Sequence, residues 1–157
     1  MMRVVGLVET ALRAVAALCL AVLTTLVVAQ VFLRYGLGSV PFFTEEVARY
    51  AMIWMALLAT AVGVREASHI RVDFVPTALG VASPPTQLVL EAVLDVISLT
   101  AFLVLLWYGI DMTIFAAGQT SDGLRISLSY PYAAVPVAFF FASAFAILRL
   151  VEKLRQP

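Results

Sequence analysis

The residues best suited to chemistry stand at the start of one apolar stretch. Glu45, Glu46 and Arg49 precede an uncharged run that extends to Val64. Thr44 is suited to cap a helix here, and carboxylates in a first helical turn are favoured by the helix dipole. Glu46 and Arg49 are three residues apart and can form an ion pair. We expect capping from Glu45, whereas for Glu46 and Arg49 interfacial anchoring and docking of a partner fit equally well.

The residue types in and around this stretch do not favour proton transfer or metal binding. A proton relay needs titratable groups that continue through the membrane, and beyond Tyr50 the stretch offers only Thr60. At its far end His69 and Asp73 could form an oriented pair, but without a nearby nucleophile or second ligand we expect a surface turn. One histidine and the lone Cys19 cannot build a zinc site. We therefore expect no catalytic residue, no metal and no bound cofactor.

Composition places the chain in a lipid bilayer. Of its 157 residues, 63% are hydrophobic and 13% are charged, against roughly 25% charged residues in soluble domains. The formal net charge is zero, which excludes nucleic acid as a partner. The run from Glu46 to Val64 gives about 28 Å of helix, close to the thickness of a bilayer core. We expect a single membrane domain over residues 1–157.

The apolar stretches predict an all-α integral membrane protein. The four expected transmembrane helices cover residues 14–33, 44–64, 86–117 and 129–150. The first stretch is longer than the apolar part of a typical signal peptide, which favours a retained helix. A short surface segment over residues 70–85 should join helices two and three. We expect an exposed turn over 118–123, and we expect Pro136 to kink helix four or to lie near its start.

Charged and small residues make further predictions for the helices. Glu91 and Asp95 are like charges at a spacing of four and repel, so we expect both to be solvated near the headgroups. Stripes of small residues let helices approach closely in lipid. The two stripes expected to pack helices together are Ala17, Ala21, Thr25 and Ala29 in helix one, and Ala134, Ala138, Ala142 and Ala146 in helix four.

Several short motifs, taken together, resemble those of a known family. They are Arg34-Tyr35, Glu45-Glu46, Arg49-Tyr50, Trp54, Arg65, the run His69-Ile70-Arg71-Val72-Asp73, Gly118-Gln119-Thr120-Ser121, and Pro136. In this order and spacing the chain resembles, over nearly its whole length, the small permease subunit (DctQ-like) of tripartite ATP-independent periplasmic (TRAP) transporters. The chain departs from the family at two positions: it has Phe43 where the family often has tryptophan, and Ser68 where the family often has glycine.

The resemblance implies a role in a larger assembly. In this family a periplasmic binding protein delivers an organic acid, and a large membrane subunit holds the substrate and sodium sites. The small subunit acts as a scaffold in the bacterial inner membrane, so sodium-dependent transport would belong to the complex. The candidate partner contacts are Arg34, Tyr35, Glu45, Glu46, Arg49, Tyr50, Trp54, His69 and Asp73.

The residues themselves agree with a scaffold, although another class is open. Ion sites of secondary transporters use discontinuous helices, and the four apolar stretches predict mostly continuous ones. The alternative is a stand-alone homo-oligomeric four-helix protein, either a channel or a small membrane enzyme. An enzyme using Glu46 and His69 is disfavoured, because these residues fall at opposite ends of helix two.

The distribution of basic residues predicts the orientation. One side would carry Arg3, Arg13, Arg65, Arg71, Arg149, Lys153 and Arg155, and the other only Arg34, Arg49 and Arg125. Because basic residues favour the cytoplasmic side, both termini should be cytoplasmic.

Single cysteines in a Cys19→Ser background test this orientation. With an impermeant maleimide on intact cells, a cysteine at Ser39 should be labelled and one at Ser83 should not. Labelling at Ser83 would contradict the orientation.

Overall fold

The computed structural model describes residues 2–66 and 84–155. Its elements are α1 (Met2–Leu37), α2 (Phe42–Glu66), α4 (Pro84–Ala116), α5 (Ser129–Tyr132) and α6 (Ala134–Arg155). His69, Asp73 and nearly all of the expected surface segment at 70–85 lie outside the described residues.

Four spans in the described part are long and apolar enough to cross a membrane. They are Val5–Leu37, Phe43–Glu66, Ala92–Ala116 and Ser129–Val151. The expected all-α fold with four such helices is therefore confirmed, and the chain is a multi-pass membrane protein. With 36 and 33 residues, α1 and α4 are about 54 and 50 Å long at 1.5 Å per residue, and so exceed a bilayer core of about 30 Å.

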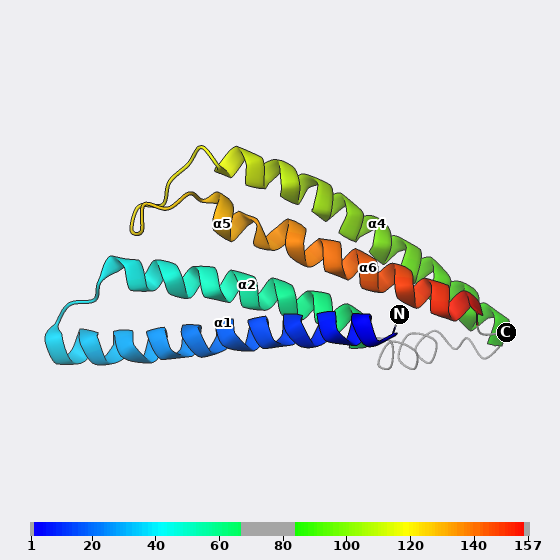
Figure 1. Ribbon diagram of the computed structural model, residues 1–157, viewed down its shortest axis with the longest axis horizontal. Coiled ribbons are helices and arrows are strands. Elements are labelled where there is room, and N and C mark those ends of the chain that lie inside the picture. Colours follow the sequence, from blue (N-terminus) through cyan, green and yellow to red (C-terminus); the bar gives the residue numbers. More distant parts are fainter. Residues whose placement is uncertain (1, 67–83, 156–157) are drawn as a thin grey trace.

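The helices form a row of two antiparallel pairs (Figure 1). Helix α1 packs on α2, α2 on α6, and α6 on α4, so α1 and α4 are the outer members of the row. The start of α1 and the end of α6 lie at one end of the bundle, and residues 38–41 and 117–128 connect the helices at the other. We call these the terminal end and the loop end.

Prolines divide the last span into two helices. Pro136 has no N–H to donate to the carbonyl of Tyr132, and its ring would clash with that carbonyl in a continuous helix. Helix α5 accordingly ends at Tyr132, and α6 begins at Ala134. The interruption lies about one turn before Pro136, which is where a proline disrupts a helix.

Helix α2 begins earlier than expected. Its first residue is Phe42 rather than one following a cap at Thr44. The Thr44 hydroxyl instead donates a hydrogen bond to the Pro41 carbonyl at 2.7 Å, and Thr44 is buried. The expected cap at Thr44 is wrong, because this residue already lies within the first turn.

The alanine stripe of α6 lies at the centre of the packing. Ala134, Ala138 and Ala142 are 0%, 2% and 1% exposed. The latter two form a buried cluster with Ala61 of α2, and Phe102 of α4 packs against it. Small side chains therefore let α6 approach both neighbours closely.

A second buried cluster joins three helices nearer the terminal end. Leu12 and Ala16 of α1 pack with Leu58 and Val62 of α2 and with Phe145 of α6. Trp54, expected at a partner surface, packs against this cluster and is half-buried. The first pair of helices is thus attached to α6 by apolar contacts.

The stripe of α1 has a different environment. Ala17, Ala21, Thr25 and Ala29 are all exposed within this chain. The Thr25 hydroxyl donates to the Ala21 carbonyl at 2.8 Å, so its polar group is satisfied within the helix. A close contact on this stripe would need a second chain, and its role in packing stays a prediction.

Helix α4 approaches the start of α6 closely at Gly109, which is buried. A Cβ at this position would lie 2.8 Å from Cγ1 of Val135 and 3.2 Å from the backbone nitrogen of Pro136. No other residue type fits here without displacing a neighbour. At Gly63, by contrast, a Cβ would meet nothing within 4 Å.

Gly109→Leu should destabilise the bundle by about 1–3 kcal/mol through overpacking. Reversible unfolding in mixed micelles measures this, with Gly63→Leu as the matched helical control. A variant at Gly109 as stable as that control would refute the close approach.

Candidate functional site

At the loop end, Glu46 connects α2 to the segment that precedes α5. Its Oε2 accepts a hydrogen bond from the backbone N–H of Leu124 at 2.8 Å, and its Oε1 accepts one from the Tyr50 hydroxyl. Both oxygens of the carboxylate are therefore engaged within the chain. The ion pair that the spacing of Glu46 and Arg49 allows is not formed in the described part of the chain.

The segment held by Glu46 is a small hairpin. Thr120 and Ser127 form an isolated antiparallel bridge, and the Ser121 N–H donates to the Ile126 carbonyl at 2.8 Å. At the tip Arg125 adopts a positive φ of 53°, which is uncommon outside glycine. The turn is not exposed throughout, because Ser121 is only 5% exposed. We call residues 119–128 the loop-end hairpin.

A second polar contact at this end joins α1 to α2. Nη2 of Arg34 lies 3.3 Å from Oε1 of Glu45, and both side chains are more than half exposed. Such exposed pairs contribute about 0–1 kcal/mol, so this one steadies the connection only weakly. Tyr35, beside it in the sequence, is 87% exposed, and with Arg34 it remains accessible to a partner.

A groove opens beside these contacts between α2 and the start of the last span. Its volume is about 370 Å³. The lining residues are Arg49, Tyr50 and Ile53 from α2, Pro131 and Tyr132 from α5, and Val135 from α6. Apart from one cation and two phenols its walls are apolar, so the groove combines a single charged group with a mainly hydrophobic lining.

At the terminal end, ion pairs join the first two helices. Nε of Arg65 lies 2.9 Å from Oε2 of Glu9, while Arg13 pairs with both Glu9 and Glu66. The Arg65 guanidinium also lies 6.0 Å from the centre of the Phe145 ring. These charges form a closed network in which each acid has a basic partner.

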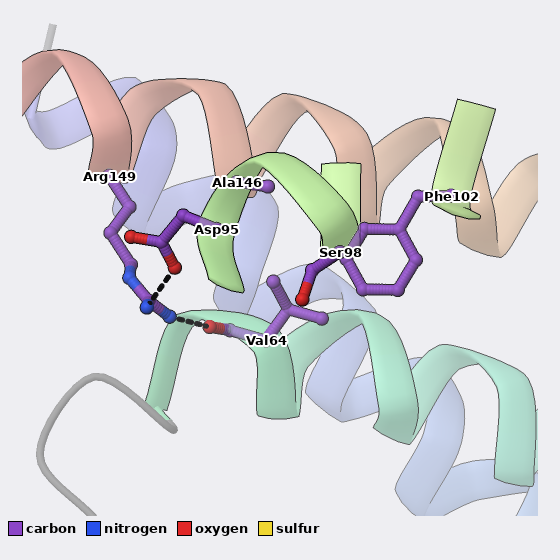
Figure 2. A pocket seen from close by; sticks show the side chains of 6 residues that line it. All are labelled: Val64, Asp95, Ser98, Phe102, Ala146 and Arg149. Atoms are coloured by element: carbon purple, nitrogen blue, oxygen red, sulfur yellow. Dashed lines mark hydrogen bonds and ion pairs between the residues drawn. The ribbon is translucent and has the colours of Figure 1, made fainter. Parts of the chain in front are cut away.

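A more deeply placed pair joins the other helices at this end (Figure 2). Asp95 of α4 pairs with Arg149 of α6, whose Nη1 also lies 3.5 Å from the carbonyl of Val64 in α2. Asp95 is 7% exposed, so the expectation that it is solvated near the headgroups is wrong. Burial is tolerated because the guanidinium compensates the carboxylate.

The cavity beside this pair is very small. Val64, Asp95, Ser98, Phe102, Ala146 and Arg149 line it, and its volume is about 10 Å³. A hollow of that size is at the lower limit for a single water molecule. It therefore offers no room for an organic substrate.

The sequence reasoning missed the contact between Asp95 and Arg149, although a signal was present. An ionisable residue within a membrane span normally faces the bundle and has a partner. Arg149 lies at the same end of the last span, because α4 and α6 are antiparallel neighbours. The sequence reasoning compared Asp95 only with Glu91, four residues away on the same helix, and therefore missed Arg149.

Comparison with known proteins gives a consistent result. Residues 23–156 match the family described as "Tripartite ATP-independent periplasmic transporters, DctQ component". A putative TRAP transporter small permease protein of Haemophilus influenzae is 30% identical over 86% of this chain and 82% of its own length. The isethionate TRAP transporter permease protein DctMQ of Oleidesulfovibrio alaskensis is 33% identical over 69% of this chain. The match spans only 17% of that longer relative.

Removing the Glu46 carboxylate should loosen the loop-end hairpin. Glu46→Ala leaves the Leu124 N–H and the Tyr50 hydroxyl without their acceptor, which costs about 1–3 kcal/mol. Hydrogen exchange should therefore accelerate at Leu124.

Glu45→Ala is the control, since Glu45 forms its ion pair with the exposed Arg34 and not with the hairpin. Equal exchange at Leu124 in both variants would show that Glu46 does not hold the hairpin.

Proposed function

The chain belongs to the DctQ family of TRAP transporter components and is a small permease subunit, and we propose that it works as a scaffold for a large permease subunit. The supporting observation is the contrast between its inner and outer surfaces. The buried alanines of α6 pack against other helices inside the bundle, whereas the small residues of the α1 stripe are exposed. One outer helix is thus free to receive a larger membrane partner.

The longer relative supports a partner of this kind. In DctMQ of Oleidesulfovibrio alaskensis the segment similar to this chain is 17% of a single polypeptide. A segment joined covalently to a much larger chain works beside it. We infer that the present chain likewise lies beside a large permease subunit in the membrane.

The size of one hollow supports a substrate site outside this chain. The cavity of about 10 Å³ at Asp95 is too small for an organic acid, and the groove at Arg49 opens at the loop end. We therefore place the organic acid and sodium sites in the large subunit. In this proposal the small subunit performs no enzymatic step and binds no cofactor, and transport by the complex depends on sodium.

The proposed setting is the bacterial inner membrane, with both termini in the cytoplasm. The loop end would then face the periplasm, where a substrate-binding protein docks. Arg34 and Tyr35 are exposed at this end, and Glu46 holds the loop-end hairpin against the start of α2. We propose that Glu46 shapes this surface for the partner instead of contacting it.

Ala21→Leu tests the scaffold directly. Because Ala21 is exposed within this chain, leucine should leave the bundle intact and disturb only a contact with another chain. Overpacking of that contact should cost about 1–3 kcal/mol, or roughly 5- to 150-fold in affinity. Co-purification with the large subunit and sodium-driven uptake by the reconstituted complex should fall together.

Two further leucine variants make the result interpretable. Ala101→Leu adds the same volume to an exposed position of α4 and should leave assembly unchanged. Ala138→Leu enters the buried seam and should destabilise the subunit itself. Full assembly of Ala21→Leu with an altered sodium dependence would instead assign this subunit a part in ion coupling, and transport by the purified chain alone would favour a homo-oligomeric channel.

A further inference from the structure

The loop end contains a cation that its neighbouring acids do not neutralise. Glu45 pairs with Arg34, and Glu46 is engaged by Tyr50 and by the backbone of Leu124. Arg49, on the same turns of α2, is exposed and makes no ion pair with another residue in the described part of the chain. Its charge is therefore available to an anion from outside.

This cation stands at the mouth of an apolar groove. Ile53 of α2 lies one turn further into the membrane span, and Val135 of α6 lines the opposite wall. Tyr50 and Tyr132 add phenol groups close to the cation. The groove has a volume of about 370 Å³ and thus combines one positive charge with mainly apolar walls.

The groove lies at the depth of the lipid headgroups. Tyrosine and tryptophan concentrate where a bilayer meets water, and this end of the bundle exposes Trp107, Tyr108, Tyr130 and Tyr132. Below that level a membrane protein is surrounded by acyl chains. An occupant with an anionic head at this depth and an apolar body beneath it would match both parts of the groove.

We propose that this groove binds one anionic phospholipid, with its phosphate at Arg49 and an acyl chain along Ile53 and Val135. The phosphate oxygens accept hydrogen bonds from the guanidinium, which suits planar contacts with phosphate. The acyl chain covers apolar walls that would otherwise be poorly filled at the subunit surface. Binding requires both features, which distinguishes a lipid from free phosphate.

Lipid titrations of the purified full chain in detergent test the proposal, with native mass spectrometry as the readout. Phosphatidylglycerol should bind with 1:1 stoichiometry, diacylglycerol with the same acyl chains should bind more weakly, and inorganic phosphate should not compete. Arg49→Gln should weaken phosphatidylglycerol binding by about fivefold to tenfold. Arg34→Gln, which removes a paired cation at the same end, should have little effect.

A second variant tests the apolar part. Ile53→Trp fills the groove and should abolish the 1:1 complex, whereas Met52→Trp at an exposed neighbouring position should not. Unchanged binding in Arg49→Gln or in Ile53→Trp would overturn the proposal. So would competition by inorganic phosphate, or cross-linking of Arg49 to a carboxylate of a protein partner in the assembled transporter with no lipid retained.

Discussion

Close packing along α6 is the constraint on which the rest of this structure depends. In lipid, moving an apolar side chain from the acyl chains into a helix contact gains little free energy. Helices therefore associate through close van der Waals contact. Ala138 and Ala142 provide that contact for α2, while Phe102 of α4 packs against the same cluster. On the α4 side Gly109 meets Val135 without room for a Cβ. Helix α6 therefore carries small residues at these close contacts, and the outer helices α1 and α4 expose many large apolar residues.

Polar contacts hold the two ends of the bundle in different ways. At the terminal end the buried Asp95 is compensated by Arg149, because an isolated charge there would be costly. At the loop end Glu46 accepts hydrogen bonds from Tyr50 and from the Leu124 backbone. The first contact joins neighbouring helices, whereas the second orders a connection that has little apolar surface of its own. Both carboxylates therefore hold separate parts of the chain together.

The proposed scaffold role is consistent with this distribution of contacts. The charged side chains inside the bundle are engaged with one another, and the hollow beside Asp95 is smaller than any organic substrate. What the subunit leaves available lies on its outside, namely the exposed stripe of α1 and the groove at Arg49. The partners that we propose for these surfaces are a large membrane protein and a lipid.

The sequence alone determined the class of the protein and the position of its spans. Four long apolar stretches predict four helices because a bilayer demands internally hydrogen-bonded segments, and Pro136 predicts a kink or a helix start in the last span because its ring excludes a continuous helix. Tertiary structure alone decided which polar groups meet. Asp95 finds Arg149 on another helix, and Glu46 finds a backbone N–H 78 residues away. Periodicity describes each helix separately, whereas such contacts depend on which helix lies beside which and at what depth.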